Sequence, residues 1–259
     1  MKTTKDIRIA VLIDADNVPS ANVKGMLEEI AKYGTPTFKR IYGDWTKPNL
    51  AGWKNVLLES AITPIQQYSY TTGKNSTDSA MIIDAMDILY SEKVDAFAIV
   101  SSDSDFTKLA IRLREAGMTV IGLGERKTPN PFIVACDKFI YLEILKPATV
   151  AAVVPRAKVE SSKTEKKITA AVDTTAIQKV GKETMNLITS SIADLADDTG
   201  WAFLGDVGNL IIKKQPDFDA RNFGYSKLGQ MLKRIHRFEV DERETDKKGI
   251  KLVYVRVKG

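Results

Sequence analysis

Short apolar runs rich in β-branched residues alternate with longer amphipathic stretches from residue 8 to about residue 145. Such alternation is typical of repeated βαβ units with a parallel sheet. The apolar runs predict strands near residues 8–13, 37–42, 62–67, 95–100, 118–123 and 139–144. The amphipathic stretches predict helices near residues 20–33, 49–60, 77–91, 104–116 and 130–136. We therefore expect residues 1–146 to form an α/β domain with a mainly parallel sheet flanked by helices.

The pattern changes after residue 146. Residues 147–180 are rich in Lys, Glu, Ser and Thr with little apolar periodicity, which predicts a flexible linker. Residues 181–259 show three helical stretches followed by two alternating segments, near 237–242 and 250–257. The last helical stretch carries apolar residues at helical spacing, namely Leu228, Met231, Leu232 and Ile235. Three helices and a terminal hairpin predict a smaller winged-helix domain.

Composition excludes several classes of protein and site. The chain has one cysteine and one histidine among its 259 residues, which excludes an internal disulfide, a Cys/His zinc cluster and the usual serine or cysteine triads. No run of about 18 apolar residues occurs, and the first residues lead into a strand rather than a signal peptide. We therefore expect a cytoplasmic protein without a membrane segment, whose catalysis would use carboxylates, hydroxyls, lysine or a bound ion.

The net charge of +5 is unevenly distributed. Basic and acidic side chains balance in residues 1–146, so the whole excess lies in the linker and the small domain. A polyanion would be held there more readily than by the α/β domain. Ordinary solubilising charge is the alternative interpretation.

Carboxylates follow two of the predicted strands and begin one predicted helix. Asp14 and Asp16 come directly after the first strand, Asp103 and Asp105 after the fourth, and Asp78 starts the third helix. The carboxyl ends of parallel strands open onto a common crevice, so these acids can converge. Converging carboxylates hold Mg²⁺ or Mn²⁺, ions that activate water and stabilise phosphoryl charge. The sequence therefore predicts a metal-dependent phosphoester enzyme.

Each of these residues also has a purely structural interpretation. Asp78 and Asp105 stand at helix starts, where a carboxylate stabilises the helix by about 0.3–1 kcal/mol. Asn17 precedes Pro19 as a turn or capping residue would, and its functional alternative is an amide that positions substrate or water. The combination favours a metal site more than any single member does.

Three further residues lie near this cluster in sequence. Asp16 is expected to support the residues that bind the metal ion, without binding the ion itself. Asp84 falls roughly 120° from Asp78 around a helix of about 3.6 residues per turn, which predicts a buried, hydrogen-bonded supporting role. Lys74 is a candidate phosphate contact or an ordinary exposed loop lysine.

These motifs resemble the NYN domain, a branch of the PIN-like ribonuclease superfamily. The resemblance spans about residues 7–145 and rests on residues 11–19, on Asp78 with Asp84, and on residues 100–106. It implies a PIN-like, Rossmannoid α/β sandwich whose acidic quartet binds divalent metal and hydrolyses RNA. The matched positions are Asp14, Asp78, Asp103 and Asp105, with Asn17 beside them.

The C-terminal part resembles the OST-HTH, or LOTUS, domain over about residues 181–258. The resemblance rests on residues 200–210 and 216–228, and it implies a winged helix that binds RNA or docks a protein. Candidate RNA contacts are the basic residues around its third helix, Lys227, Lys233, Arg234 and Arg237. A solvated helix face is the alternative. Trp201 and Phe203 are expected in the core rather than as base-stacking residues.

The combined hypothesis is a Mg²⁺- or Mn²⁺-dependent ribonuclease, for which we favour endonucleolytic action on single-stranded or structured RNA. The alternative is a non-catalytic RNA-binding scaffold. The segment from Asp14 to Val18 also matches the first motif of haloacid-dehalogenase-like phosphatases, with Asp14 as nucleophile and Asp16 as general acid. Asp78 has no place in that pattern. The oligomeric state, a protein partner of the small domain and the RNA sequence stay open.

Overall fold

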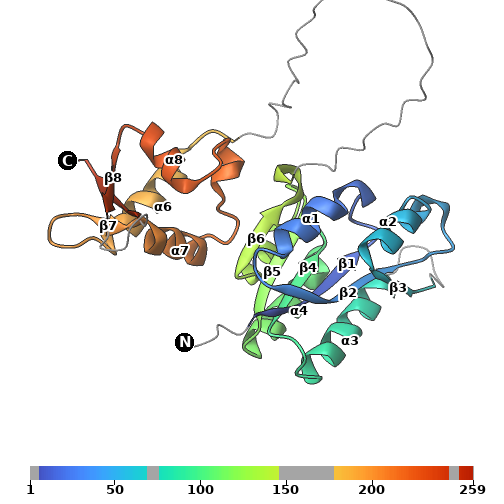
Figure 1. The fold of residues 1–259 in the computed structure, drawn as a ribbon. Helices are drawn as coiled ribbons and strands as arrows, with labels where there is room; N and C mark the ends of the chain where they lie inside the picture. The colour runs from blue at the N-terminus through green and yellow to red at the C-terminus, as the bar shows by residue number, and fades with distance from the viewer. Residues whose placement is uncertain (1–5, 69–75, 146–177, 245–250, 259) are drawn as a thin grey trace, which may run out of the picture.

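The computed structural model describes residues 6–68, 76–145, 178–244 and 251–258, which form an α/β domain and a smaller C-terminal domain (Figure 1). The predicted Lys74 and most of the predicted linker lie outside these residues. Of the linker's last residues, Val180 packs against the small domain's core, and the backbone N–H of Gln178 donates to the carbonyl of Asn222. Within the described parts of the chain, no helix is both long enough and apolar enough to cross a bilayer.

The first domain is built on a six-stranded, fully parallel sheet of order β3-β2-β1-β4-β5-β6. Its strands are β1 (Arg8–Asp14), β2 (Thr35–Gly43), β3 (Thr63–Gln66), β4 (Ala96–Val100), β5 (Thr119–Gly124) and β6 (Lys138–Tyr141). All five residues of β4 are buried, as expected of a parallel strand covered on both faces. The predicted α/β class is confirmed, and β1 and β4, which precede the acidic motifs, pair at the centre of the sheet.

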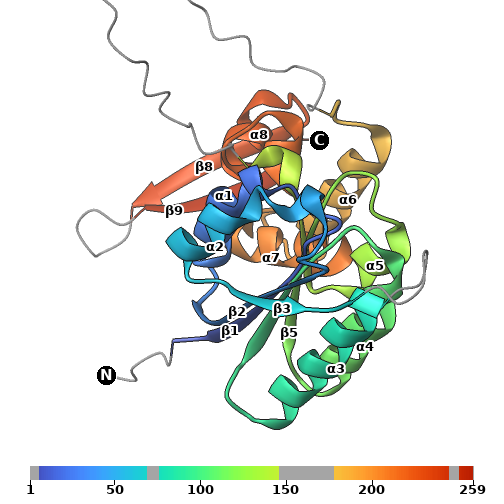
Figure 2. The same ribbon diagram turned by 90° about the vertical axis from the view of Figure 1, so that its right-hand side faces the viewer.

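Helices cover both faces of this sheet (Figures 1 and 2). They are α1 (Val23–Ile30), α2 (Trp53–Ser60), α3 (Ser76–Tyr90), α4 (Thr107–Glu115) and α5 (Asn130–Ala135). Helices α1 and α2 pack with Ile9, Val11 and Ile13 of β1 in one core cluster. Helices α3, α4 and α5 pack in the other, with Ala10 and Leu12. Alternate residues of one strand thus serve two cores, which explains the continuous apolar run before Asp14.

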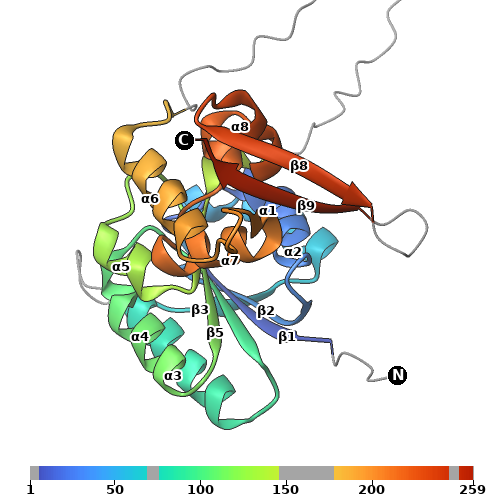
Figure 3. The same cartoon turned by 90° about the vertical axis from the view of Figure 1, so that its left-hand side faces the viewer.

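The second domain has the predicted three helices and terminal hairpin (Figure 3). Its elements are α6 (Lys182–Ala193), β7 (Ala202–Phe203), α7 (Leu204–Lys214), α8 (Leu228–Arg234), β8 (Phe238–Glu244) and β9 (Lys251–Val257). The strands form an antiparallel sheet of order β7-β9-β8. Of the predicted apolar stripe, Met231 and Leu232 are inaccessible to solvent, whereas Leu228 and Ile235, the latter just after the end of α8, pack partly buried against the same core.

The loop between α7 and α8 joins the two domains along the β6 edge and α1. Arg221 forms a two-pronged ion pair with Glu29 of α1, both N–O distances being 2.8 Å. The Tyr141 hydroxyl of β6 donates to Asp217 at 2.7 Å. A backbone bond from Phe139 N–H to the Pro216 carbonyl, 2.9 Å long, also caps part of the β6 edge. Covering an edge strand removes a template for unwanted strand pairing.

Candidate metal centre

Asp14 stands at the carboxyl end of β1 and is 1% exposed. A buried carboxylate is tolerated when hydrogen bonds replace its hydration. Asp14 accepts three: from Asn17 Nδ2 at 2.6 Å, Ser101 Oγ at 2.8 Å and the backbone N–H of Asp16 at 3.0 Å. Burial raises the pKa of Asp14, and these hydrogen bonds oppose the rise without cancelling it. Asp14 is therefore a fixed, hydrogen-bonded acid behind the mouth of the site.

Three other carboxylates meet close enough for the charge of Asp14 to act on one of them, Asp78. Asp78, Asp103 and Asp105 each offer an oxygen, and these oxygens lie within 4.8 Å of one another. Asp78 comes from the first turn of α3, and Asp103 follows β4. Asp105 lies in the 3₁₀ turn η3 (Ser104–Phe106), whose start Asp103 caps by accepting the Asp105 N–H at 2.9 Å. Among the described residues, this is the group with the geometry to hold a metal ion.

Electrostatic repulsion within the group is visible at Asp78. Its pKa is raised from the ordinary 3.8 to about 6 by burial and then by the negative charges of Asp14, Asp103 and Asp105. Carboxylates that repel one another are stabilised by a cation placed between them. Ligands of an octahedral Mg²⁺ are about 3 Å apart when adjacent and about 4.2 Å apart when opposite, so the three side chains would draw closer together to hold one ion. The donor set therefore fits Mg²⁺ or Mn²⁺.

The structure separates the predicted quartet into two layers. Asp78, Asp103 and Asp105 form the three-carboxylate group, whereas Asp14 lies outside it. Asn17 binds Asp14 rather than pointing into that group. Asp16 is exposed beside the site, where its charge contributes to the raised pKa of Asp78.

Asp84 does not join the carboxylate group. It accepts hydrogen bonds from Arg40 and from the Tyr42 hydroxyl, both on β2, and thereby ties α3 to the sheet. Asp84 thus anchors the helix that carries Asp78.

The four basic candidates of the small domain are exposed. Lys227 begins α8 and lines a pocket of about 320 Å³ between the domains. Lys233 forms an ion pair with Glu242 at 2.5 Å, while Arg234 ends α8 and Arg237 precedes β8.

Ser101 is a site residue to which the sequence assigned no role. Its hydroxyl donates to Asp14 and accepts a hydrogen bond from the backbone N–H of Asp103 at 3.0 Å. Ser101 thereby links the buried Asp14 to Asp103 of the three-carboxylate group. Gly124 of β5 permits this packing, since a Cβ at that position would lie 2.6 Å from the Ser101 carbonyl oxygen. The available signal was position: Ser101 is the first polar residue after the buried strand β4.

A pocket of about 420 Å³ opens beside the centre. Its lining includes Asp16, Asn17, Trp53, Glu125 and Lys127. Lys127 pairs with Glu125 at 2.6 Å and supplies a positive charge next to the acidic residues.

The comparisons with known proteins agree with this architecture. The NYN domain model matches residues 8–143, and the OST-HTH/LOTUS domain model matches residues 175–250. No curated protein matches the chain.

Three similar solved structures are bacterial. A protein of unknown function from Vibrio parahaemolyticus is 20% identical, with 54% of this chain and 96% of that chain covered and a TM-score of 0.47. An uncharacterised protein from Nitrosomonas europaea is 31% identical over 39% of this chain and 92% of that one, with a TM-score of 0.30. Residues 175–257 of a Chromobacterium violaceum protein are 33% identical over 30% of this chain and 84% of that one, with a TM-score of 0.25.

The match over residues 8–143 covers more than half of the chain and agrees with a parallel sheet whose central strands lead into clustered acids. The chain belongs to the NYN domain family, within the PIN-like nuclease superfamily, and carries an OST-HTH/LOTUS domain after its NYN domain.

Proposed function

We propose that this protein is a divalent-metal-dependent ribonuclease. The observation that carries the proposal is the convergence of Asp78, Asp103 and Asp105 to within 4.8 Å, with buried Asp14 near enough to act on Asp78. Bound Mg²⁺ or Mn²⁺ would supply stabilisation of phosphoryl charge and a more acidic water. Asp78, Asp103 and Asp105 would hold the ion.

Asp14 is the proposed fourth acid, and its geometry limits how it takes part. Its Oδ2 accepts from both Asn17 and Ser101, whereas its Oδ1 accepts one backbone N–H. An ionised carboxylate oxygen has about two acceptor sites, so Oδ1 has capacity for one more interaction than the hydrogen bond from Asp16. Asn17 and Ser101 thereby fix the orientation of Asp14 and, through the Asp103 N–H, the start of η3.

The small domain would hold RNA near this centre. OST-HTH/LOTUS domains are associated with RNA binding, and the exposed basic residues on and after α8 offer phosphate contacts. Linking a weak binding domain to a catalytic domain raises the local concentration of substrate. We propose RNA as the partner and endonucleolytic cleavage as the reaction.

The phosphatase hypothesis fits the structure poorly. Its nucleophile would be Asp14, whose side chain is almost fully buried and whose Oδ2 is occupied by two donors. An attacking carboxylate oxygen needs access to phosphorus.

The test is cleavage of end-labelled RNA, structured and unstructured, by the full chain with Mg²⁺, Mn²⁺ or EDTA. We expect cleavage with either metal, none with EDTA, and none from Asp103→Asn with an unchanged circular dichroism spectrum. Asp87→Asn is the matched control, because Asp87 is exposed on α3 outside the carboxylate group and should retain activity. Equal cleavage by Asp103→Asn and wild type would refute the proposal, and RNA binding without cleavage would favour the scaffold alternative.

A further inference from the structure

The small domain's sheet has an outer face on which aromatic and arginine side chains gather. Strand β9 alternates so that Val255 lies in the core, fully buried, while Tyr254 and Arg256 take the opposite face. Register places Phe203 of β7 across from Tyr254 on the same face. We call this surface the aromatic face; its members are Trp201, Phe203, Arg243, Tyr254 and Arg256.

The π surfaces of this face are in mutual contact. The Arg243 guanidinium lies 4.2 Å from the Tyr254 ring centre and 5.2 Å from that of Trp201. The Arg256 guanidinium lies 4.7 Å from the Trp201 ring centre. Phe203 and Tyr254 meet edge to face with centroids 5.9 Å apart. Three rings and two planar cations thus form one continuous cluster of stacking groups.

Acidic residues of β8 hold the two guanidiniums in place. Asp241 pairs with Arg243 at 3.0 Å, and Glu239 pairs with Arg256 at 2.5 Å. Exposed ion pairs of this kind add little stability, but they restrict how the guanidinium planes are oriented. They also leave the face with little net charge, which suits contact with flat, uncharged groups.

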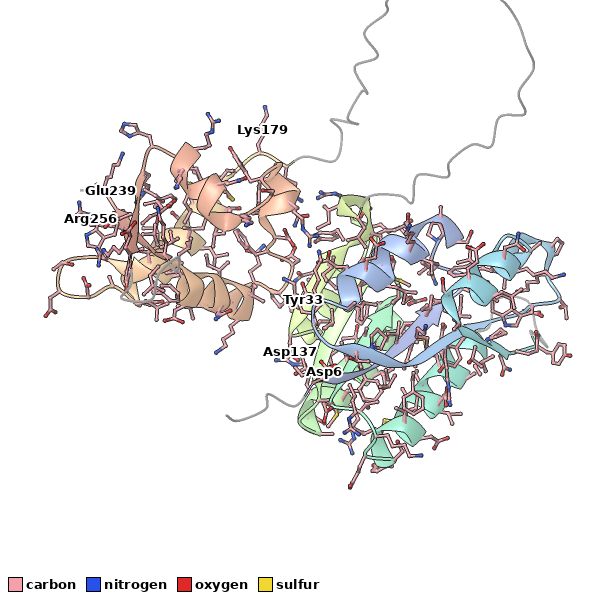
Figure 4. The ribbon with its side chains drawn as sticks, viewed as in Figure 1. Asp6, Tyr33, Asp137, Lys179, Glu239 and Arg256 are labelled. Atoms are coloured by element: carbon pink, nitrogen blue, oxygen red, sulfur yellow. The ribbon has the colours of Figure 1, made fainter. Side chains whose placement is uncertain are left out.

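The aromatic face is turned toward solvent. Phe203 is 37% exposed, and Trp201 and Tyr254 are half-buried. The predicted core position of Phe203 is therefore wrong: Ala202 points into the core, so both its neighbours in the strand direction point outward. Figure 4 shows labelled Glu239 and Arg256 on the side of the small domain away from the NYN domain. Figure 3 shows β8 and β9 on the outside of the helices.

Basic side chains border one end of this face. The Lys258 N–H donates to the Arg237 carbonyl at 2.9 Å, which extends the β8–β9 pairing beyond the opposed residues Glu239 and Arg256. Arg237 and Lys258 are both exposed there. A strand of RNA lying across the face would thus meet rings first and cationic side chains at the border.

We propose that the aromatic face binds single-stranded RNA by stacking unpaired bases on Trp201, Tyr254 and the arginine planes. Aromatic rings and guanidiniums are the groups on which splayed-out bases stack, and each such ring contributes substantially to binding. Arg237 and Lys258 contact phosphates at the border. A duplex is a poor ligand because its bases already stack on one another. The choice of RNA as ligand rests on the proposed function.

The test uses the full chain carrying Asp103→Asn, in EDTA, with fluorescently labelled oligo(U) and oligo(A) and a duplex of equal length. We expect Tyr254→Leu, which keeps a strand-compatible apolar residue, to weaken single-strand binding about tenfold and leave duplex binding unchanged. The slope of log K against log salt stays the same in Tyr254→Leu, whereas Lys258→Ala reduces it by about one. Tyr90→Ala is the control, since Tyr90 is an exposed ring on α3 far from this face.

A second measurement does not depend on substitutions. In NMR spectra, added oligo(U) should shift the indole N–H signal of Trp201, which belongs to the aromatic face. RNA binding with an unmoved Trp201 signal, wild-type affinity in folded Tyr254→Leu, or no single-strand binding would each overturn the proposal. If wild type cleaves RNA but any of these results is found, the aromatic-face proposal is refuted and the ribonuclease proposal is retained. If RNA binds to the aromatic face but is not cleaved, the ribonuclease proposal is refuted and the aromatic-face proposal is retained.

Discussion

Replacing Asp78 by Asn should stabilise the metal-free protein and at the same time abolish the proposed metal-dependent cleavage of RNA. The carboxylate of Asp78 is repelled by Asp14, Asp103 and Asp105, and its pKa is raised to about 6. Asn keeps the shape and removes the charge. Without a cation to offset the repulsion from its neighbours, the charge of Asp78 should destabilise the folded protein.

The magnitude follows from the pKa. The difference between 3.8 and about 6 corresponds to about 3 kcal/mol, at about 1.36 kcal/mol for each pKa unit. Asp78 is partly exposed, so solvent screening reduces this figure to about 1–2 kcal/mol. Loss of a carboxylate from the first turn of α3 removes about 0.3–1 kcal/mol of helix stabilisation. We expect a net gain of about 1 kcal/mol in the free energy of unfolding.

The pH dependence has a definite sign. Because the folded pKa lies above the ordinary one, the folded state holds the proton more tightly and is favoured at low pH. That advantage is complete below about pH 4 and disappears as the pH rises through about 6. The gain from Asp78→Asn should therefore be present at pH 7.5 and absent at pH 4.

The assay is urea unfolding in EDTA, monitored by tryptophan fluorescence, to which Trp45 and Trp53 of the NYN domain contribute. Adding Mn²⁺ at about 100 times its dissociation constant should stabilise wild type by about 2.7 kcal/mol and Asp78→Asn far less. Asp87→Asn, on the exposed side of the same helix, should behave as wild type in both experiments. Lower stability of Asp78→Asn at pH 7.5, or an unreduced response to Mn²⁺, would refute the reasoning.

Two further predictions concern contacts behind and beside the centre. Ser101→Ala removes a donor to Asp14 and should lower the free energy of unfolding by about 1–2 kcal/mol and slow RNA cleavage; unfolding and cleavage rates unchanged from wild type would contradict this. Burial alone would raise the pKa of Glu29, but Arg221 and Lys32 outweigh it and lower that pKa to about 2. The Glu29–Arg221 pair should therefore hold the domains together above about pH 4.5 and weaken as the pH falls toward 2. Arg221→Ala should increase the radius of gyration measured by small-angle X-ray scattering at pH 7, and the exchange Glu29→Arg with Arg221→Glu should partly reverse it.

The fold was predictable because the hydrophobic patterns of both its strands and its helices were strong. Strand β4 is an uninterrupted buried run, and α8 keeps its apolar residues at helical spacing. Strand β7 escaped prediction because two residues, Ala202 and Phe203, are too few to show a period. The predicted helix over residues 20–33 is shorter in the structure, where a 3₁₀ turn over Ser20–Asn22 precedes α1.

From the sequence, the site could be located at one edge of the sheet, but the arrangement of its acids there could not be predicted. Parallel topology places the acids after β1 and β4 at one edge, and the sequence shows where those strands end. The division into a buried Asp14 and an outer group depends on the pairing of Ile13 with Val100, which sets Ser101 against Asp14. No spacing in the sequence encodes that register. The hydrogen-bonding role of Ser101 was therefore visible only in three dimensions.

If both proposed RNA-contacting surfaces act on one strand, their positions make the length of the RNA a variable of the proposed reaction. The small domain packs on Tyr141 of β6 and Glu29 of α1, while its aromatic face lies on the far side from the NYN domain. A domain of this size has a radius of gyration of roughly 12 Å, so RNA must pass around it to touch both the face and the carboxylates. A short RNA cannot touch both surfaces at once, so its cleavage does not depend on the aromatic face. The effect of Tyr254→Leu on kcat/KM should therefore grow from none with the shortest cleavable RNAs to about tenfold with long ones. A length series with wild type and Tyr254→Leu measures this directly, and an effect equal at every length would show that the two surfaces do not share one strand.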